Sequence, residues 1–383
     1  MAENYRQQVE QEWEKYNNKA HYPNIMLLGA TGCGKSSLIN RVFDTNVAFV
    51  SDTGRGTTDF DIYYGEKTGM RVNLIDSMGF EMGDRNTLNE YINSIKNWIK
   101  KNQNKENAVH LIWYCVQVPN MSIQDWDAEV LRTIMNEPTL KDKVALVITK
   151  CDQDDEDLST AKAGINEARR LVGKALPAFR VTVDKKFPLD LEKLVEWSGN
   201  SIDDEDVRRM FIASQMISLK EKRKQAALIV SGAALGAGAV GAIPIPFADA
   251  PILTAGQVAM SAGIIACYGL NMAQGAVKGL VGSVLLSSLG KSLVGSLAKL
   301  IPGVGSVINA AVAATITAAL GAAISEISYA CCKKIAKGET LLLEDAFSAE
   351  AIGEATKNFL QSFKNKSKDE ITRMITIEAD KED

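Results

Sequence analysis

Two periods of hydrophobic spacing alternate along the first half of the chain. Five short apolar runs are typical of buried strands, and they occupy residues 25–28, 61–64, 72–75, 109–116 and 144–149. Longer segments between them carry apolar side chains at helical spacing, at residues 86–102, 122–136 and 158–175. Strands that alternate with helices predict a mostly parallel sheet covered by helices on both faces. The second and third runs are close enough to form a hairpin, which would give the sheet one antiparallel edge.

The second half of the chain has a different pattern, because charge almost disappears from it. Residues 226–330 contain five charged side chains, and the rest are mostly Ala, Gly, Ser, Val, Leu and Ile. Four apolar segments there are long enough to cross a bilayer as helices: residues 226–248, 250–270, 280–298 and 303–325. Two interpretations stay open. The helices contact or span a membrane, or they form a compact soluble bundle with small residues at the helix contacts.

These shifts in composition predict the domain organisation. A length of 383 residues exceeds one ordinary hydrophobic core, so two domains are expected. We expect a polar N-terminal helix, an α/β domain, an all-α Gly/Ala-rich domain and a charged tail, at residues 1–20, 21–200, 205–365 and 366–383. Trp13 and Tyr16 are the residues that would dock the N-terminal helix.

Overall composition excludes several classes of protein. A net charge of −4 does not suggest a nucleic-acid-binding protein, so no nucleic-acid partner is expected. The six cysteines show neither the spacing of a metal site nor that of a secreted domain, which predicts reduced thiols in the cytoplasm. The first 18 residues are polar and lack the apolar core of a signal peptide.

A glycine-rich turn follows the first predicted strand. Residues 29–36 read GATGCGKS and fit the phosphate-binding pattern GxxxxGK[ST] in full. Its glycines let backbone N–H groups curl around phosphate oxygens, and the next helix adds its positive end. Lys35 would reach the β- and γ-phosphates, and the Ser36 hydroxyl would bind Mg²⁺. The predicted nucleotide contacts are Thr31, Gly32, Cys33, Gly34, Lys35, Ser36 and Ser37.

Two further segments would complete the phosphate and metal site. Asp76 directly follows an apolar strand and opens a DxxG motif, so its carboxylate would hold Mg²⁺ through water, while the Gly79 N–H would sense the γ-phosphate. A mobile loop over residues 54–59 would supply a threonine hydroxyl to Mg²⁺. Thr58 is the expected ligand and Thr57 the alternative. Lys35, Thr58 and Gly79 are therefore the predicted catalytic groups.

The base is predicted to be guanine. Residues 149–152 read TKCD after a strand, and the Asp152 carboxylate would accept hydrogen bonds from two guanine N–H groups. Adenine offers no such donor pair, so a carboxylate buried against it would stay unpaired. The Lys150 stem would lie over the base. A base-sensing loop is expected near Thr182, after the last strand.

These motifs, in this order, resemble the regulatory GTPases that include Era-like proteins and septins. The sequences GATGCGKSSLIN and VHLIWYCVQVPNMSIQDWDAEVLR are most similar to immunity-related GTPases and their bacterial relatives, over residues 22–200. The resemblance implies a Mg²⁺-dependent P-loop GTPase with switch loops at 51–60 and 77–86. The second half, over 205–365, resembles a Gly/Ala-rich helical domain of bacterial GTPases and inner-membrane proteins that has no assigned function.

One departure from the family pattern narrows the expected activity. Phe80 stands where Ras-like relatives carry the glutamine that orients the attacking water. This implies slow unaided hydrolysis, assisted by dimerisation across the nucleotide, by a partner, or by Arg55 or Glu81. Gly32 replaces the asparagine of many potassium-stimulated relatives, which argues against potassium as the charge-stabilising element.

Three hypotheses about function follow. In the first, the protein hydrolyses GTP to GDP and phosphate, and its nucleotide state controls the helical domain. The second is a septin-like scaffold that assembles in its GTP state and hydrolyses little. A homodimer through the GTPase domain is a possible partner arrangement. The third is a membrane protein with a regulatory GTP-binding domain. The expected location is the cytoplasm, or a peripheral or integral position at the inner membrane with lipid as a partner.

Overall fold

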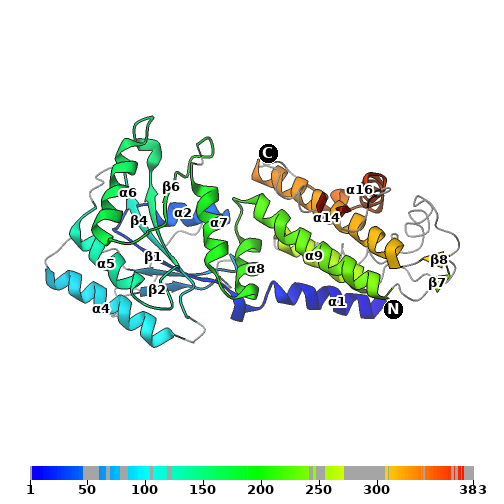
Figure 1. Ribbon diagram of the computed structural model, residues 1–383, viewed down its shortest axis with the longest axis horizontal. Coiled ribbons are helices and arrows are strands. Elements are labelled where there is room, and N and C mark those ends of the chain that lie inside the picture. The colour runs from blue at the N-terminus through cyan, green and yellow to red at the C-terminus, as the bar shows by residue number, and fades with distance from the viewer. Residues whose placement is uncertain are drawn as a thin grey trace. The chain divides into compact units, whose positions relative to one another are not determined.

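The computed structural model describes residues 2–45, 60–65, 70–77, 85–103, 107–118, 123–187, 189–240, 245–246, 255–270, 307–308, 310–337, 339, 341–363, 366, 370–371 and 373–374. The chain divides into two compact units. The sheet unit comprises Lys19–Ser218, and the helical unit comprises Met1–Asn18 together with Leu219–Asp383. Figure 1 shows the elements of both units.

The sheet unit is an α/β layer structure, which confirms the predicted fold class (Figure 1). Its strands are β1 (Asn24–Leu28), β2 (Phe60–Tyr63), β3 (Asn73–Ser77), β4 (Leu111–Gln117), β5 (Val144–Thr149) and β6 (Ala178–Arg180). They lie in the order β2-β3-β1-β4-β5-β6. All neighbours are parallel except β2 and β3, which form the predicted antiparallel edge.

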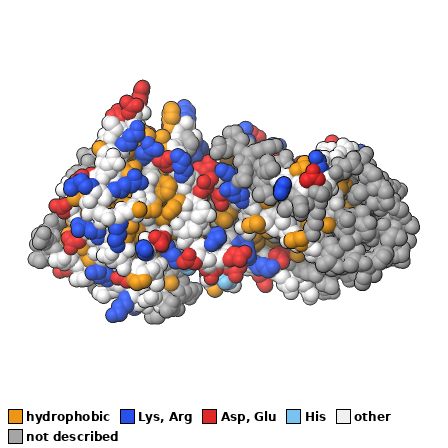
Figure 2. Space-filling view, in the orientation of Figure 1, with side chains coloured by type: hydrophobic (Ala, Val, Ile, Leu, Met, Phe, Trp, Pro, Cys, Tyr) orange, Lys and Arg blue, Asp and Glu red, His pale blue; other side chains and the backbone are white. Residues whose placement is uncertain are grey.

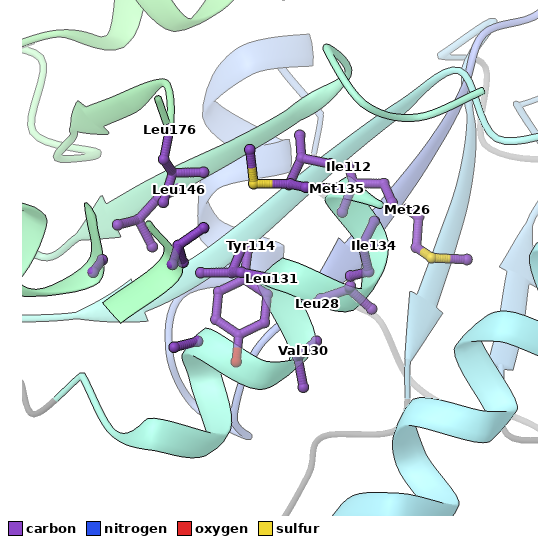
Figure 3. Packing of buried hydrophobic residues seen from close by; sticks show 14 of the residues in the cluster. Met26, Leu28, Ile112, Tyr114, Val130, Leu131, Ile134, Met135, Leu146 and Leu176 are labelled. Carbon is purple, nitrogen blue, oxygen red and sulfur yellow. The ribbon is translucent and has the colours of Figure 1, made fainter. Parts of the chain in front are cut away.

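Helices cover both faces of this sheet. They are α2 (Lys35–Phe43), α4 (Arg85–Asn102), α5 (Asp125–Met135), α6 (Ser159–Val172), α7 (Leu191–Ser201) and α8 (Glu205–Ser214), with short 3-10 helices η1 (Lys19–His21) and η2 (Cys151–Gln153). Alternate residues of β1 enter opposite cores, because successive side chains of a strand point to opposite faces. Met26 and Leu28 join the cluster under α4, α5 and α6 (Figure 3), whereas Ile25 and Leu27 join the cluster under α2, α7 and α8.

The boundary of the sheet unit lies further along the chain than composition indicated. Helix α8 begins at Glu205, where the helical domain was expected to start, yet it belongs to the sheet unit. Val207 and Phe211 are buried in the core under α2, and the rings of Phe43 and Phe211 meet edge to face with centroids 6.3 Å apart. This apolar face fixes α8 to the sheet unit.

The helical unit is built around one long helix. Its described elements are α1 (Ala2–Lys15), α9 (Leu219–Val240), α10 (Ala255–Cys267), α14 (Ala310–Ala336), α15 (Leu343–Ala346), α16 (Ala349–Ser362) and the short paired strands β7 (Ile245–Pro246) and β8 (Val307–Ile308). Helix α14 packs against α9, α10 and α16. A Cβ placed on Gly321 of α14 would lie 2.6 Å from Val230 Cγ2 and 3.0 Å from Met260 Sδ, so glycine permits this close contact.

The N-terminal helix α1 belongs to the helical unit, although the sheet unit follows it directly in the sequence. Trp13 and Tyr16 are both 2% exposed, and Trp13 Nε1 donates a hydrogen bond to Ala262 O of α10 at 3.2 Å. The sheet unit is therefore inserted, in the sequence, between two segments of the helical unit.

Polar groups are also buried in the helical unit. The Lys222 side chain is fully buried, and its Nζ donates to Tyr268 O at 3.2 Å, just past the C-terminus of α10, where a cation is favoured by the helix dipole. Gln257 Nε2 donates to Thr317 Oγ1 at 3.0 Å, between α10 and α14. These contacts fix the helices by specific bonds as well as by apolar packing.

Among the described helices, one segment of α14 is long and apolar enough to cross a membrane. This segment is Ala313–Ala336, and 72% of its most apolar stretch is buried by the rest of the protein. A core helix of a soluble bundle has the same length and composition. The predicted span at 280–298 lies outside the described residues, and the other three predicted spans are described in part.

Candidate functional site

The phosphate-binding turn lies between β1 and α2. Gly29, Gly32 and Gly34 have φ values of 128°, 76° and 95°, which side chains rarely adopt. A Cβ on Gly29 would lie 2.2 Å from Cys115 O, whereas one on Gly32 would meet no atom within 4 Å. The turn is thus packed on the strand side and open on the other. Helix α2 begins at Lys35, and the N–H groups of its first turn lack partners within the helix.

Lysine and aspartate meet at this turn. Lys35 is 8% exposed, and its Nζ donates to Gly29 O at 3.0 Å and Ala30 O at 3.3 Å. The same Nζ is 3.9 Å from Asp76 Oδ1 at the end of β3. Ser36 follows Lys35 at the start of α2. The carboxylate and hydroxyl oxygens of this group are the ligands that Mg²⁺ prefers, so the residues fit such an ion.

A second group of residues gathers at the ends of β4, β5 and β6. Lys150 has a φ of 55°, and its Nζ donates to Gly32 O at 2.8 Å and also to Gln117 Oε1. Thr182 Oγ1 donates to Asp152 Oδ1 at 2.9 Å and accepts from Asp184 N at 3.1 Å. The carboxyl ends of the parallel strands therefore bring the phosphate turn, residues 150–152 and the loop at Thr182 to one edge, which is where open α/β sheets bind ligands.

A comparison with protein families agrees with the motifs found in these residues. Residues 24–150 match the family model described as 50S ribosome-binding GTPase. The sheet unit carries a P-loop GTPase domain. The match covers the phosphate turn, Asp76 and Lys150, and it ends two residues before Asp152.

Curated relatives match about a third of this chain or less. Translocase of chloroplast 132 from Arabidopsis thaliana is 34% identical over 113 residues, which are 29% of this chain and 9% of that protein. GTPase Der from a Nitratiruptor species is 31% identical over 136 residues, or 35% of this chain and 26% of that protein. The chain thus spans about a tenth of the translocase and a quarter of Der.

Solved structures match about half of this chain. Toc33 from Arabidopsis thaliana in complex with Mg²⁺ and GMPPNP has a TM-score of 0.35 at 16% identity, covering 53% of this chain and 91% of that one. The probable GTP-binding protein engB has a TM-score of 0.32 at 16% identity, covering 47% of this chain and 98% of that one.

The structure places the sequence-predicted residues of the GTPase domain as follows. Lys35 and Asp76 meet beside the predicted phosphate site, and Asp152 and Thr182 meet at the predicted base site. Thr31, Gly32 and Ser37 are exposed, whereas Cys33 is buried, and Ser36 and Gly34 are half-buried. Thr58, its alternative Thr57, Gly79 and Phe80 lie outside the described residues, as do Arg55 and Glu81.

Cys33 of the GTPase domain has an altered acidity. A hydrogen bond with the Cys115 thiol and the nearby charge of Lys35 lower the pKa of Cys33 to about 7, against the opposing effect of burial. The Cys33 carbonyl is also fixed, because Thr149 Oγ1 donates to it. The end of strand β5 thus holds the phosphate turn through a side-chain hydrogen bond.

Sequence reasoning missed two contributors to the site of the GTPase domain. Gln117 ends β4 and accepts from Lys150, and the signal was a polar residue that closes the apolar run LIWYCV. Tyr91 lies on α4 and bonds Ser77, the residue after Asp76. Its position in an amphipathic helix gave no sign of this contact, because an aromatic residue there usually belongs to the core.

Proposed function

We propose that this protein binds GTP with Mg²⁺, hydrolyses it to GDP and phosphate, and uses its nucleotide state to control the helical unit. The observation that carries this proposal is that two pairs of predicted site residues lie at the same edge of the sheet. Lys35 lies 3.9 Å from Asp76 at the phosphate end, and Thr182 holds Asp152 at the base end.

In this proposal each residue at the phosphate end has a defined part. Ser36, Thr58 and, through water, Asp76 would hold Mg²⁺, and the ion would neutralise charge on the β- and γ-phosphates. Lys35 releases its contacts with the turn carbonyls and pairs with the same phosphates. The N–H groups of the turn and of Gly79 donate to phosphate oxygens, so that charge developing on the transferred group is stabilised.

Guanine specificity rests on Asp152. The Thr182 hydroxyl occupies one lone pair of Oδ1, which orients the carboxylate and leaves acceptor sites for the two guanine N–H groups. Asp152→Asn replaces one acceptor with a donor, so we expect GTP to bind more weakly and xanthosine triphosphate to bind better. Asp157→Asn, on the same exposed loop, is the matched control and should change neither affinity. Equal GTP affinity of Asp152→Asn and the wild type would contradict the base assignment.

The connectivity of the chain supports control of the helical unit. The GTPase domain is joined at both ends to segments of the helical unit, namely α1 and α9. A nucleotide-driven change therefore has two covalent routes to the same set of helices. Hydrogen exchange of α9 and α14 with GDP or with a non-hydrolysable GTP analogue tests this. Identical protection in both states would refute the control hypothesis while leaving GTP binding intact.

Two alternatives differ in what the GTP state does. In the scaffold alternative, GTP promotes a homodimer through the GTPase domain and is hydrolysed little. Single-turnover hydrolysis measured across protein concentrations separates the cases. A rate that rises with concentration supports catalysis activated by dimerisation, whereas no turnover at any concentration supports the scaffold.

The membrane alternative is favoured by one exposed face of α9. Leu228 is 67% exposed and Leu235 is 55% exposed, and the seven-residue spacing puts both on one side with the exposed Gly232. Such a face fits a lipid surface at the inner membrane. A protein found only in the cytoplasm would fit the soluble bundle instead. Figure 2 shows one face of the molecule with its side chains coloured by type. Cell fractionation with high-salt and alkaline washes distinguishes the membrane alternative from the soluble bundle. Resistance to both supports spanning, release by either supports peripheral contact, and recovery only in the soluble fraction excludes the membrane alternative.

A further inference from the structure

A chain of hydroxyl groups connects helix α4 to the phosphate turn. Ser77 Oγ donates to Leu27 O of β1 at 3.2 Å and lies 3.1 Å from Tyr91 Oη. Because the Ser77 proton goes to Leu27 O, Tyr91 is the donor in the second bond. The backbone N–H of Gly29 in turn donates to the Tyr91 oxygen. One tyrosine hydroxyl therefore bonds both the end of β3 and the first residue of the phosphate turn.

The surroundings keep this hydroxyl protonated at neutral pH. Burial of its oxygen raises the pKa of Tyr91 to about 12, although its hydrogen bonds with Ser77 and Gly29 oppose this. Ser77 is 1% exposed, so water does not compete for the same bond. The hydroxyl thus remains a hydrogen-bond donor under all conditions in which the enzyme would be assayed.

The partners of Tyr91 are the residues next to the groups that would bind Mg²⁺ and phosphate. Ser77 directly follows Asp76, and Gly29 opens the turn that leads to Lys35 and Ser36. A shift of Ser77 would rotate the backbone that orients the Asp76 carboxylate. Since Lys35 Nζ already contacts both Gly29 O and Asp76 Oδ1, small displacements here change the spacing of the whole charged group.

Helix α4 also contacts β2, through a pair of aromatic rings. The Trp98 ring packs on Phe60 with centroids 5.0 Å apart and an interplanar angle of 49°. Phe60 is the first described residue after the segment that contains Thr58, and Ser77 is the last before the segment that contains Gly79. One helix therefore touches both strands at the points where they meet the two predicted switch loops.

We propose that Tyr91 is a positioning residue that sets the spacing between Asp76 and the phosphate turn for Mg²⁺-dependent nucleotide binding. This inference rests on the proposed GTPase function. Tyr91 does not touch the reacting atoms. Its hydroxyl keeps β3 and the phosphate turn at a fixed spacing. Helix α4 also contacts Phe60 of β2 through Trp98.

The test removes the hydroxyl alone. In Tyr91→Phe we expect the Mg²⁺ concentration for half-maximal binding of a fluorescent GDP or GTP analogue to rise about tenfold, the factor that corresponds to about 1.4 kcal/mol. Tyr268→Phe is the matched control, because Tyr268 Oη forms a similar buried bond with Ser325 Oγ, 3.0 Å away in the helical unit. It should lower the melting temperature without moving the Mg²⁺ midpoint.

A double-mutant cycle separates positioning from general destabilisation. Ser77→Ala breaks the same link from its other side, so Ser77→Ala/Tyr91→Phe should have the Mg²⁺ midpoint of one single variant. A midpoint of Tyr91→Phe within twofold of the wild type, or effects of the two substitutions that simply add, would overturn the inference. If the wild type itself binds no GTP with Mg²⁺, the proposed function fails instead, and the two failures are distinct.

Discussion

The close contact between α9 and α14 predicts whether a glycine-to-alanine substitution raises or lowers the free energy of unfolding. Gly321→Ala puts a methyl group 2.6 Å and 2.9 Å from the two Val230 Cγ atoms. Overpacking of this kind costs about 1–3 kcal/mol. Alanine would otherwise stabilise a helix interior by about 1 kcal/mol relative to glycine. The balance is a net loss of up to about 2 kcal/mol of unfolding free energy.

The same substitution one helix away should have the opposite effect. A Cβ on Gly232 or Gly236 of α9 meets no atom within 4 Å, so only the gain in helix propensity remains. Gly232→Ala and Gly236→Ala should therefore each stabilise the protein by up to about 1 kcal/mol. The comparison holds the chemistry constant and varies only the space around the new methyl group.

Urea unfolding followed by far-UV circular dichroism measures these free energies. Hydrogen exchange of peptides from α14 assigns each change to the helical unit, and GTP binding should be the same in all three variants. Stabilisation by Gly321→Ala equal to that by Gly232→Ala would refute the reasoning, because it would mean that α9 and α14 do not pack as described.

Three further predictions concern other parts of the chain. Trp13→Ala should destabilise the helical unit by about 3–5 kcal/mol in hydrogen exchange while leaving nucleotide affinity intact, because the indole is buried and bonds Ala262 O. Burial raises the pKa of Asp127 to about 6, above its unfolded value. Its contribution to the unfolding free energy should therefore be full below about pH 4 and lost as pH rises through about 6. In urea titrations, the unfolding free energy of Asp127→Asn should lack this dependence on pH. Gln117→Ala removes one acceptor of Lys150 Nζ, which keeps its bond to Gly32 O, and stopped-flow nucleotide release should become several-fold faster. An unchanged rate would show that Gln117 does not support the predicted base site.

Local sequence patterns were sufficient to predict the strands of the sheet other than β6, and the phosphate turn. The pattern GxxxxGK[ST] has a strand before it and a helix after it, and only glycine accepts the backbone at Gly29, so residue type and geometry coincide there. The antiparallel edge followed from the short spacing between β2 and β3. In each case the cause lies within a few residues of its effect.

Long-range contacts could not be predicted in the same way. Trp13 and Tyr16 predicted that α1 docks on something, but nothing near them in the sequence shows that the partner is α10. Tyr91 and Gln117 are single polar groups whose partners are distant in the chain. Helix α8 starts within an acidic, linker-like segment, and its apolar face becomes meaningful only against α2.

The insertion of the GTPase domain between α1 and α9 has a consequence for biosynthesis. Trp13 and its partner Ala262 are 249 positions apart. At translation rates of about 5–20 residues per second, α1 waits about 12–50 s for α10 to be made. The whole sheet unit leaves the ribosome in that interval and can fold first. Helix α1 then remains attached to the folded sheet unit until α10 is made. On every newly made chain the Trp13 indole therefore stays without its partner helix α10 for that whole interval.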